Sequence, residues 1–260
     1  MVEYRKDVMV YEYDPEKRFF HVVIALKNRP GAIAEVAQLM ARAGLNVLSS
    51  FTSAGSKGEH GYWSLFAESG GKSPEEVSEL LRSSGFVEEV AVKEDKEGFV
   101  VEGAHFPLAW NTGERALLLM TGTVVRMGRK LRETFGTGAE VIFFEEGRDL
   151  GESAAKRLAE VLPAGFAERN LEEVLRIYSA IGWFRVLGVS RSEEEVRVRA
   201  GESFECSEAP KTGRPNSVFI RGNIASFVGT LLGREMNCEE VRCVAAGDDY
   251  CEFVLRPAKK

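Results

Sequence analysis

Apolar and polar positions in the first hundred residues alternate between strand-like runs and segments of helical periodicity. Residues 19–27 (FFHVVIALK) form a nearly continuous apolar run, which is typical of a buried strand. Apolar residues recur at helical spacing over 32–43, which predicts a helix after this strand. Residues 46–53 and 62–68 have strand character on either side of a glycine-rich segment at 54–61, so we expect these two strands to pair as a hairpin.

A helix start signal follows in the sequence Ser-Pro-Glu-Glu. The Ser73 side chain can accept a backbone N–H, Pro74 suits the first turn, and Glu76 can complete a capping box. Residues 87–94 then have strand character. The order strand, helix, strand, strand, helix, strand over 19–94 predicts a ferredoxin-like βαββαβ unit.

A polar join at residues 95–99 (DKEGF) separates this unit from a region of different pattern. We place the boundary near residue 97, which divides the chain into domains 1–97 and 98–260. Longer helices are predicted at 115–135, 139–161, 171–181 and 216–232, and paired strands at 183–189 and 195–204. The fold class is therefore α+β, with a βαββαβ domain followed by a mixed α/β domain.

Gly147 and Gly151 lie four residues apart within the segment that is predicted as a long helix. Two small residues at this spacing share one helix face, so they let a second helix approach closely. We interpret the pair as a packing feature rather than as a phosphate-binding loop.

Composition and charge narrow the class of protein. The chain has 260 residues, of which 44% are hydrophobic and 28% are charged, and this excludes a disordered composition. No apolar run approaches the roughly 20 residues that span a bilayer, and the first residues lack the apolar stretch of a signal peptide. We therefore expect a cytoplasmic protein without a membrane segment. The net charge of -6 opposes nucleic-acid binding, which needs a basic surface.

The loop between the first strand and the first helix carries a recognisable motif. Asn28-Arg29-Pro30-Gly31-Ala32, the following helix and the segment 43–47 (AGLNV) resemble the opening of an ACT domain. The resemblance implies a homodimer and a small ligand, often an amino acid, which would be bound by Asn28, Arg29, Pro30, Gly31, Ala32 and Ile33. Gly31 lets the backbone approach a ligand closely, and the N–H groups that open a helix favour a carboxylate.

Two other interpretations of this loop stay open. Pro30 and Gly31 can simply turn the chain, and ACT domains can serve only as dimerisation surfaces. The histidines His21 and His60 are assigned no function, because isolated histidines are commonly solvated or hydrogen-bonded to the backbone.

All four cysteines lie in the last quarter of the sequence, at Cys206, Cys238, Cys243 and Cys251. Cys243 and Cys251 flank a Gly-Asp turn between two segments of strand character, and a hairpin would bring their sulfur atoms together. Thiolates with a nearby carboxylate suit zinc, which prefers four ligands in a tetrahedral array. Reduced core thiols, a Cys243–Cys251 disulfide and a redox sensor are the alternatives.

The segment that contains these cysteines resembles a known family. From Gly222 through Gly233-Arg234-Glu235 to Cys251-Glu252-Phe253 the sequence is similar to the C-terminal part of the 4-vinyl reductase domain, and weaker similarity begins near residue 104. This family also supplies the sensory domains of aromatic-responsive bacterial regulators. The resemblance implies a zinc hairpin with Glu240, Cys243 and Cys251 as ligands.

The sequence departs from the family at the remaining zinc ligand. A cysteine normally stands at the start of the preceding helix, and Ser217 occupies that place here. Cys206 or Cys238 could supply a replacement sulfur, because Cys238 and Glu240 would share one face of a regular strand. Water is a third candidate for this fourth position.

Both domains are therefore predicted to be binding modules. We expect a regulatory protein with a structural zinc site that senses an amino acid, a hydrophobic or aromatic molecule, or both. The chain has no dinucleotide or phosphate loop and no hydrolase signature, so we do not expect an enzyme, and zinc-dependent catalysis is the least favoured function. The alternative is an adaptor that dimerises and relays its ligand state to a protein partner. Five aromatic residues could line a pocket or belong to the core: Tyr178, Trp183, Phe204, Phe219 and Phe227.

Overall fold

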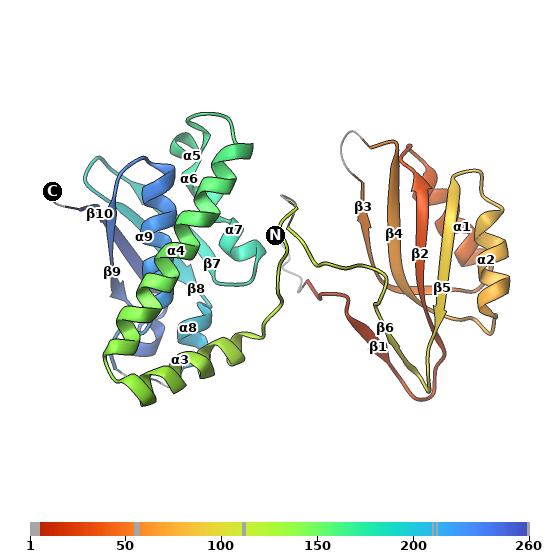
Figure 1. Ribbon diagram of the computed structural model, residues 1–260, viewed down its shortest axis with the longest axis horizontal. Coiled ribbons are helices and arrows are strands. Elements are labelled where there is room, and N and C mark those ends of the chain that lie inside the picture. The colour runs from red at the N-terminus through yellow and green to blue at the C-terminus, as the bar shows by residue number, and fades with distance from the viewer. Residues whose placement is uncertain (1–5, 55–57, 111–112, 210, 212, 259–260) are drawn as a thin grey trace. The chain divides into compact units, whose positions relative to one another are not determined.

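The computed structural model describes residues 6–54, 58–110, 113–209, 211 and 213–258. It divides into two compact units, Met1–Leu108 and Ala109–Lys260 (Figure 1). The join predicted near residue 97 precedes this division by about ten residues. The reason is a short ribbon in which strand β6 (Phe99–Val101) pairs with strand β1 (Tyr11–Tyr13), so that residues 99–101 stay with the first unit.

The first unit has the predicted βαββαβ order. Its antiparallel sheet has the strand order β3-β4-β2-β5, and two helices cover one face (Figure 1). The strands are β2 (Phe19–Lys27), β3 (Asn46–Ser53), β4 (His60–Glu68) and β5 (Val87–Glu94), and the helices are α1 (Ala32–Arg42) and α2 (Pro74–Arg82). The capping box of α2 is present, with hydrogen bonds in both directions between Ser73 and Glu76. Residues 55–57 of the predicted β3–β4 turn lie outside the described residues.

Alternation along β2 separates two environments. Phe20, Val22 and Ile24 are buried in the core between the sheet and the two helices. Phe19 and His21 lie on the opposite face, because successive side chains of a strand point to opposite sides. There Phe19 forms a small buried cluster with Phe66 of β4 and Val100 of β6. The β1–β6 ribbon therefore covers part of the face that has no helix.

The second unit is a four-stranded antiparallel sheet with helices. The strand order is β7-β8-β10-β9, formed by β7 (Arg185–Arg191), β8 (Val196–Gly201), β9 (Met236–Arg242) and β10 (Cys251–Pro257). The longer helices are α3 (Thr121–Phe135), α4 (Gly138–Val161) and α9 (Val218–Leu231). Short helices are α5 (Phe166–Arg169), α6 (Leu171–Leu175), α7 (Ile177–Ala180), α8 (Phe204–Ser207) and the 3-10 turn η1 (Val244–Ala246).

Two helices predicted in this unit differ from those observed. Helix α3 begins only at Thr121, so residues 115–120 precede it as irregular chain with one isolated bridge. The segment 171–181 is divided at Arg176 into α6 and α7. Within the described part of the chain no helix combines the length and the apolar character that crossing a bilayer requires.

Helices α4 and α9 cross with their backbones in close contact, as the glycine spacing predicts. A Cβ atom on Gly147 would lie 2.2 Å from the carbonyl oxygen of Phe219, and a Cβ atom on Gly222 would lie 2.1 Å from that of Phe144. Gly151 faces the Asn223 carbonyl in the same way. These distances leave no room for any side chain, so the glycines on both helices set the separation at this crossing.

Substitution at the crossing should therefore destabilise the second unit. We expect Gly222→Ala to lower the free energy of unfolding by about 1–3 kcal/mol, because the added methyl group overpacks the helix contact. Gly138→Ala is the matched control, since a Cβ atom there meets nothing within 4 Å. Urea denaturation should show a loss for Gly222→Ala and none for Gly138→Ala, and equal midpoints would contradict the close crossing.

Candidate metal centre

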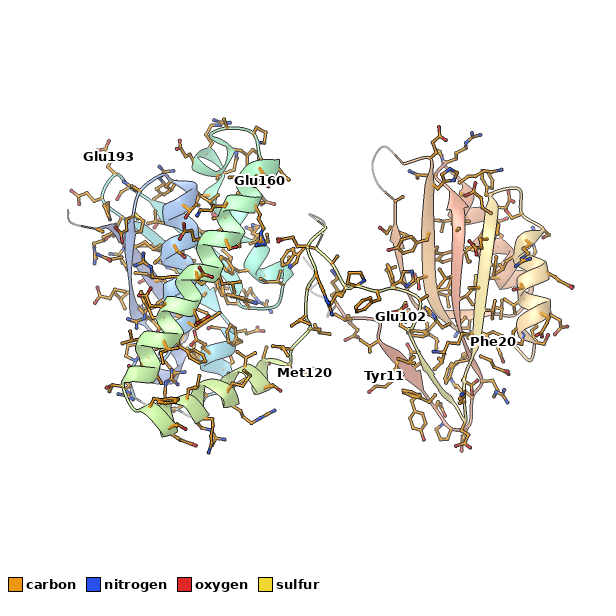
Figure 2. The ribbon with its side chains drawn as sticks, viewed as in Figure 1. Tyr11, Phe20, Glu102, Met120, Glu160 and Glu193 are labelled. Atoms are coloured by element: carbon orange, nitrogen blue, oxygen red, sulfur yellow. The ribbon has the colours of Figure 1, made fainter. Side chains whose placement is uncertain are left out.

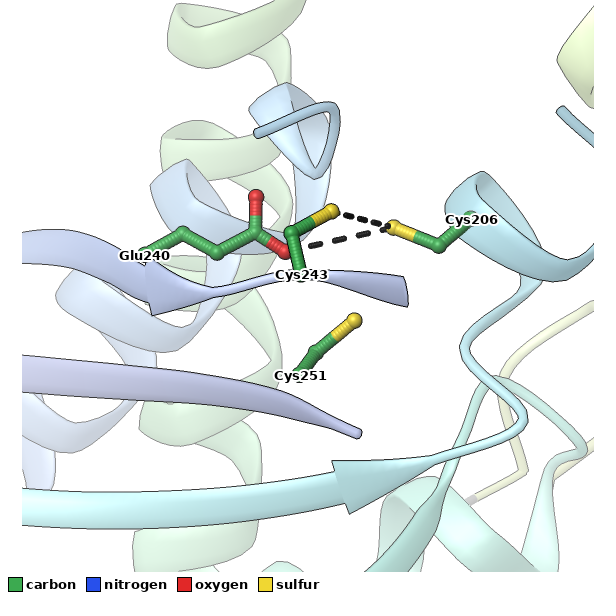
Figure 3. Close-up of side chains that lie close together, drawn as sticks. All are labelled: Cys206, Glu240, Cys243 and Cys251. Carbon is green, nitrogen blue, oxygen red and sulfur yellow. Dashed lines mark hydrogen bonds between the residues drawn. The ribbon is translucent and has the colours of Figure 1, made fainter. Parts of the chain in front are cut away.

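Four side chains from three elements converge in the second unit (Figure 3). Glu240 lies on β9, Cys243 directly follows this strand, and Cys251 begins β10. Cys206 approaches them from α8. One donor atom of each residue lies within 4.8 Å of the other three, and all four residues are buried. The structure thus brings Cys206 to the three residues that the sequence singles out.

The donor atoms have the spacing of a small metal site. The Sγ atoms of Cys206 and Cys243 are 3.4 Å apart, and Cys206 Sγ lies 3.9 Å from Glu240 Oε1. Tetrahedral ligands at the zinc–sulfur distance would be separated by about 3.8 Å. All four cysteines of the chain are free thiols, and an S–S bond would need about 2.05 Å. The cluster could therefore hold a metal ion without a large rearrangement.

The turn between β9 and β10 presents the two hairpin sulfurs. The backbone N–H of Cys243 donates to the Asp248 carboxylate at 2.8 Å, which closes the turn. Gly247 has a φ of 113°, a conformation that residues with a side chain rarely adopt. The N–H of Val244 donates to the Sγ of Cys251 at 3.5 Å. A backbone donor aimed at a sulfur atom favours the thiolate that a metal needs.

Ser217 lies at the cluster, at the place where the family has a cysteine. Its hydroxyl donates to Glu240 Oε1 at 2.7 Å, and its backbone N–H donates to Glu240 Oε2 at 3.0 Å. The hydroxyl also lies 3.0 Å from Cys206 Sγ. Because both carboxylate oxygens accept hydrogen bonds, Ser217 fixes the orientation of Glu240 while Cys206 supplies the sulfur.

Glu205 is a further buried carboxylate that the sequence pattern does not reveal. It accepts hydrogen bonds from the backbone N–H groups of Phe219 at 3.1 Å and Ile220 at 2.7 Å, in the first turn of α9. Burial raises the pKa of Glu205 to about 7. This carboxyl group attaches α8 to α9 and so positions the neighbouring Cys206.

The surroundings oppose ionisation of the thiols. Burial raises the pKa of the Cys243 thiol to about 12. A hydrogen bond with Cys251, followed by burial, raises the pKa of Cys206 well above its usual range. Thiols in such a site stay protonated unless a cation compensates the negative charge, so metal binding and thiolate formation are coupled.

Cys238, the other candidate for the fourth ligand, lies outside this group. It occupies β9 two residues before Glu240, which places it about 6.6 Å further along the strand. Its half-buried side chain packs against the apolar core of the second unit. The structure therefore separates Cys206 from Cys238, which the sequence left as equal candidates.

The loop 28–33 belongs to the first unit. Asn28, Arg29, Pro30, Gly31 and Ile33 are exposed and Ala32 is buried. The side-chain amide of Asn28 donates to the Gly58 carbonyl at 2.8 Å. Gly31 has a φ of 93° at the start of α1, where no side chain among the described residues caps the helix.

The five aromatic residues that the sequence singles out lie in mutual contact. The ring centroid of Trp183 is 5.7 Å from that of Phe204 and 5.6 Å from that of Phe219. Tyr178 contacts Trp183 and Phe227, and its hydroxyl donates to the buried Asn223 side chain at 2.6 Å. The cluster adjoins the metal centre, because Phe204 and Cys206 share the short helix α8.

Comparison with known proteins places the centre in a recognised domain. The family model of the vinyl-4-reductase domain matches residues 196–257, which include Glu240, Cys243 and Cys251, so the C-terminal part contains this domain. Two uncharacterized proteins of Methanocaldococcus jannaschii are similar over 126 residues each. One is 29% identical, covering 47% of this chain and 68% of the relative, and the other is 22% identical, covering 48% and 70%.

A solved structure shares the fold. The crystal structure of the phenol-responsive sensory domain of the transcription activator PoxR with phenol has a TM-score of 0.50 and 22% sequence identity. The match covers 57% of this chain and 79% of that chain. At this level of identity the likeness concerns the fold alone.

The cluster predicts a joint loss of metal and stability. We expect Cys243→Ser and Cys251→Ser each to lose bound metal and to lower the melting temperature, because metal binding contributes to folding where the site forms only in the folded chain. Cys238→Ser is the control, since it changes a thiol outside the cluster. Elemental analysis by plasma mass spectrometry and thermal denaturation measure both effects, and unchanged melting of both ligand variants would rule out a structural metal.

Proposed function

We propose that this chain is a small-molecule-sensing regulatory protein whose C-terminal domain binds a hydrophobic or aromatic ligand beside a structural zinc site. The observation that carries the proposal is the vinyl-4-reductase domain match over the residues of the metal centre. The fold likeness to a phenol-responsive sensory domain supports it. On this proposal the domain binds and reports a ligand rather than transforming it.

Zinc is the metal that best suits the donor set. Three cysteine sulfurs and one glutamate oxygen form a four-ligand set of the kind that zinc takes in structural sites. A site whose four positions are all filled by protein leaves no open position for catalysis. Cys206, Glu240, Cys243 and Cys251 would hold the ion, which would link α8 to the β9–β10 hairpin.

The aromatic cluster is the proposed ligand region. Trp183, Phe204 and Phe219 offer ring faces and edges to a flat apolar molecule. Phe204 lies two residues before Cys206, and Phe219 lies two residues after Ser217. A ligand inserted among these rings would move the first turns of α8 and α9, and the metal centre spans the same two helices. Ligand occupancy and the position of the hairpin would then be coupled.

The first unit is proposed as the site of a second ligand class. The exposed loop 28–33 and the uncapped start of α1 are compatible with an amino acid whose carboxylate accepts backbone hydrogen bonds. The homodimer that the ACT resemblance implies stays a prediction.

Binding of an aromatic ligand should stabilise the protein and perturb one tryptophan. We expect phenol or a related aromatic compound at about 100 times its Kd to add about 2.7 kcal/mol to the free energy of unfolding. Trp183→Phe should remove the ligand-induced change in tryptophan emission. Trp110→Phe, outside the cluster, should retain it. A panel of phenols and alkylbenzenes that leaves the melting temperature unchanged would exclude the aromatic ligand.

The amino-acid site is tested by charge at Ile33. Ile33→Glu adds a carboxylate beside the proposed ligand carboxylate, and we expect amino-acid affinity to fall at least about tenfold, which is about 1.4 kcal/mol. Ile33→Gln has nearly the same size without the charge and should change affinity little. Calorimetric titration with the common amino acids measures both variants. Equal affinities in the two variants would place the ligand elsewhere.

A further inference from the structure

A second group of metal-ligating side chains lies in the first unit, apart from the cysteines. His21 of β2 is buried, and Glu102 and His105 follow β6. One donor atom of each residue lies within 4.8 Å of the other two. Figure 2 shows Glu102 in the segment after β6, beside the sheet of this unit. The group forms on the sheet face that has no helix.

The distances between the donor atoms suit a small ion. Glu102 Oε1 lies 2.7 Å from His105 Nδ1 and 3.7 Å from His21 Nε2. Tetrahedral ligands at the zinc–nitrogen and zinc–oxygen distances would be separated by about 3.4 Å. Small rotations of the side chains would therefore place an ion between all three donor atoms.

The neighbouring groups hold the three ligands in place. The backbone N–H groups of Ala104 and His105 donate to Glu102 Oε1 at 2.9 Å and 3.0 Å, which fixes the carboxylate. The His105 ring stacks on Tyr62 with centroids 4.8 Å apart and meets Phe51 at 5.1 Å. Such packing orients the imidazole and restricts water, and both effects favour a preformed metal site.

We propose that His21, Glu102 and His105 bind a divalent first-row transition metal ion such as zinc. Imidazole and carboxylate are ligands that these ions accept, and three protein ligands leave at least one position for water or an added ligand. Ser64 Oγ lies 3.0 Å from His21 Nε2, so its hydroxyl would face that position.

Hydrogen bonding alone accounts less well for this arrangement. His105 has a carboxylate partner and His21 has a hydroxyl partner, so two separate pairs would satisfy both rings. Their convergence on one carboxylate oxygen is an additional feature, and it places a second imidazole within reach of the first pair. Burial lowers the pKa of His21, so its ring is neutral, and neutral imidazole is the form that binds metals.

The proposed ion would connect residues that are distant in sequence. His21 lies in the central part of the sheet, whereas His105 lies four residues before Ala109, where the second unit begins. Metal binding would therefore fix the start of the connecting segment on the first unit's sheet. Without metal, the Glu102–His105 pair is local and the attachment to the sheet rests on weaker contacts.

Zinc stoichiometry in the full chain tests the site. Equilibrium dialysis against Zn²⁺ followed by elemental analysis should give about two ions per chain, one for each centre. His105→Gln removes one ligand from a partly exposed position and should reduce the stoichiometry to about one. We expect at least a tenfold loss of affinity at this site, because changes to groups that only orient metal ligands already cost about 10- to 100-fold. Glu102→Gln should act in the same way.

His60→Gln is the matched control. His60 Nδ1 lies 2.7 Å from Glu88 Oε2 on the surface of the same unit, and this pair has no third donor among the metal-ligating groups of the described residues. The control should retain both ions. Substitution with Co²⁺ should show an unchanged thiolate charge-transfer band in His105→Gln, because the cysteine centre is separate.

Three results would overturn the proposal. The first is equal zinc binding by the wild-type protein and His105→Gln. The second is an equal loss in His60→Gln and His105→Gln, which would indicate surface histidine binding. The third is loss of the thiolate band in both His105→Gln and Glu102→Gln, since the two centres would then not be independent.

Discussion

Two buried carboxylates at the start of helix α9 organise the second unit. Glu240 comes from β9 and Glu205 from α8, and together they accept hydrogen bonds from the backbone N–H groups of Ser217, Phe219 and Ile220. The first turn of a helix has N–H groups without helical partners, and its partial positive charge favours anions. The same interaction therefore caps α9 and attaches both the hairpin and α8 to it. The cysteine cluster forms because these three elements meet there.

The extent to which the sequence predicts this structure follows the range of the interactions. The βαββαβ unit is determined by local signals, such as the continuous apolar run of β2 and the capping box at Ser73, and these are confirmed. The hairpin ligands were accessible because the turn between Cys243 and Cys251 is short. The start of helix α3 and the break at Arg176 were not, since packing rather than periodicity decides them.

Long-range convergence explains what the sequence did not reveal. Cys206 and Cys238 were equivalent as candidates because nothing local states that α8 folds back toward the hairpin. Glu205 resembles any exposed glutamate until its helix-capping role is seen. His21 and His105 are separated by more than eighty positions, and only the path of the chain after β6 brings them together. Spacing rules detect ligands within one hairpin or helix but not such pairs.

The close crossing of α4 and α9 has a mechanical consequence. Helix α4 has 24 residues and therefore extends about 36 Å, and its contact glycines, Gly147 and Gly151, lie near its middle. A rod held at its centre turns like a lever, so a small rotation at the crossing displaces both ends in opposite directions. Because the backbones touch without intervening side chains, little of that rotation would be absorbed locally. Movement at the ligand-proximal start of α9 would thus be amplified at the ends of α4, far from the atoms that cause it.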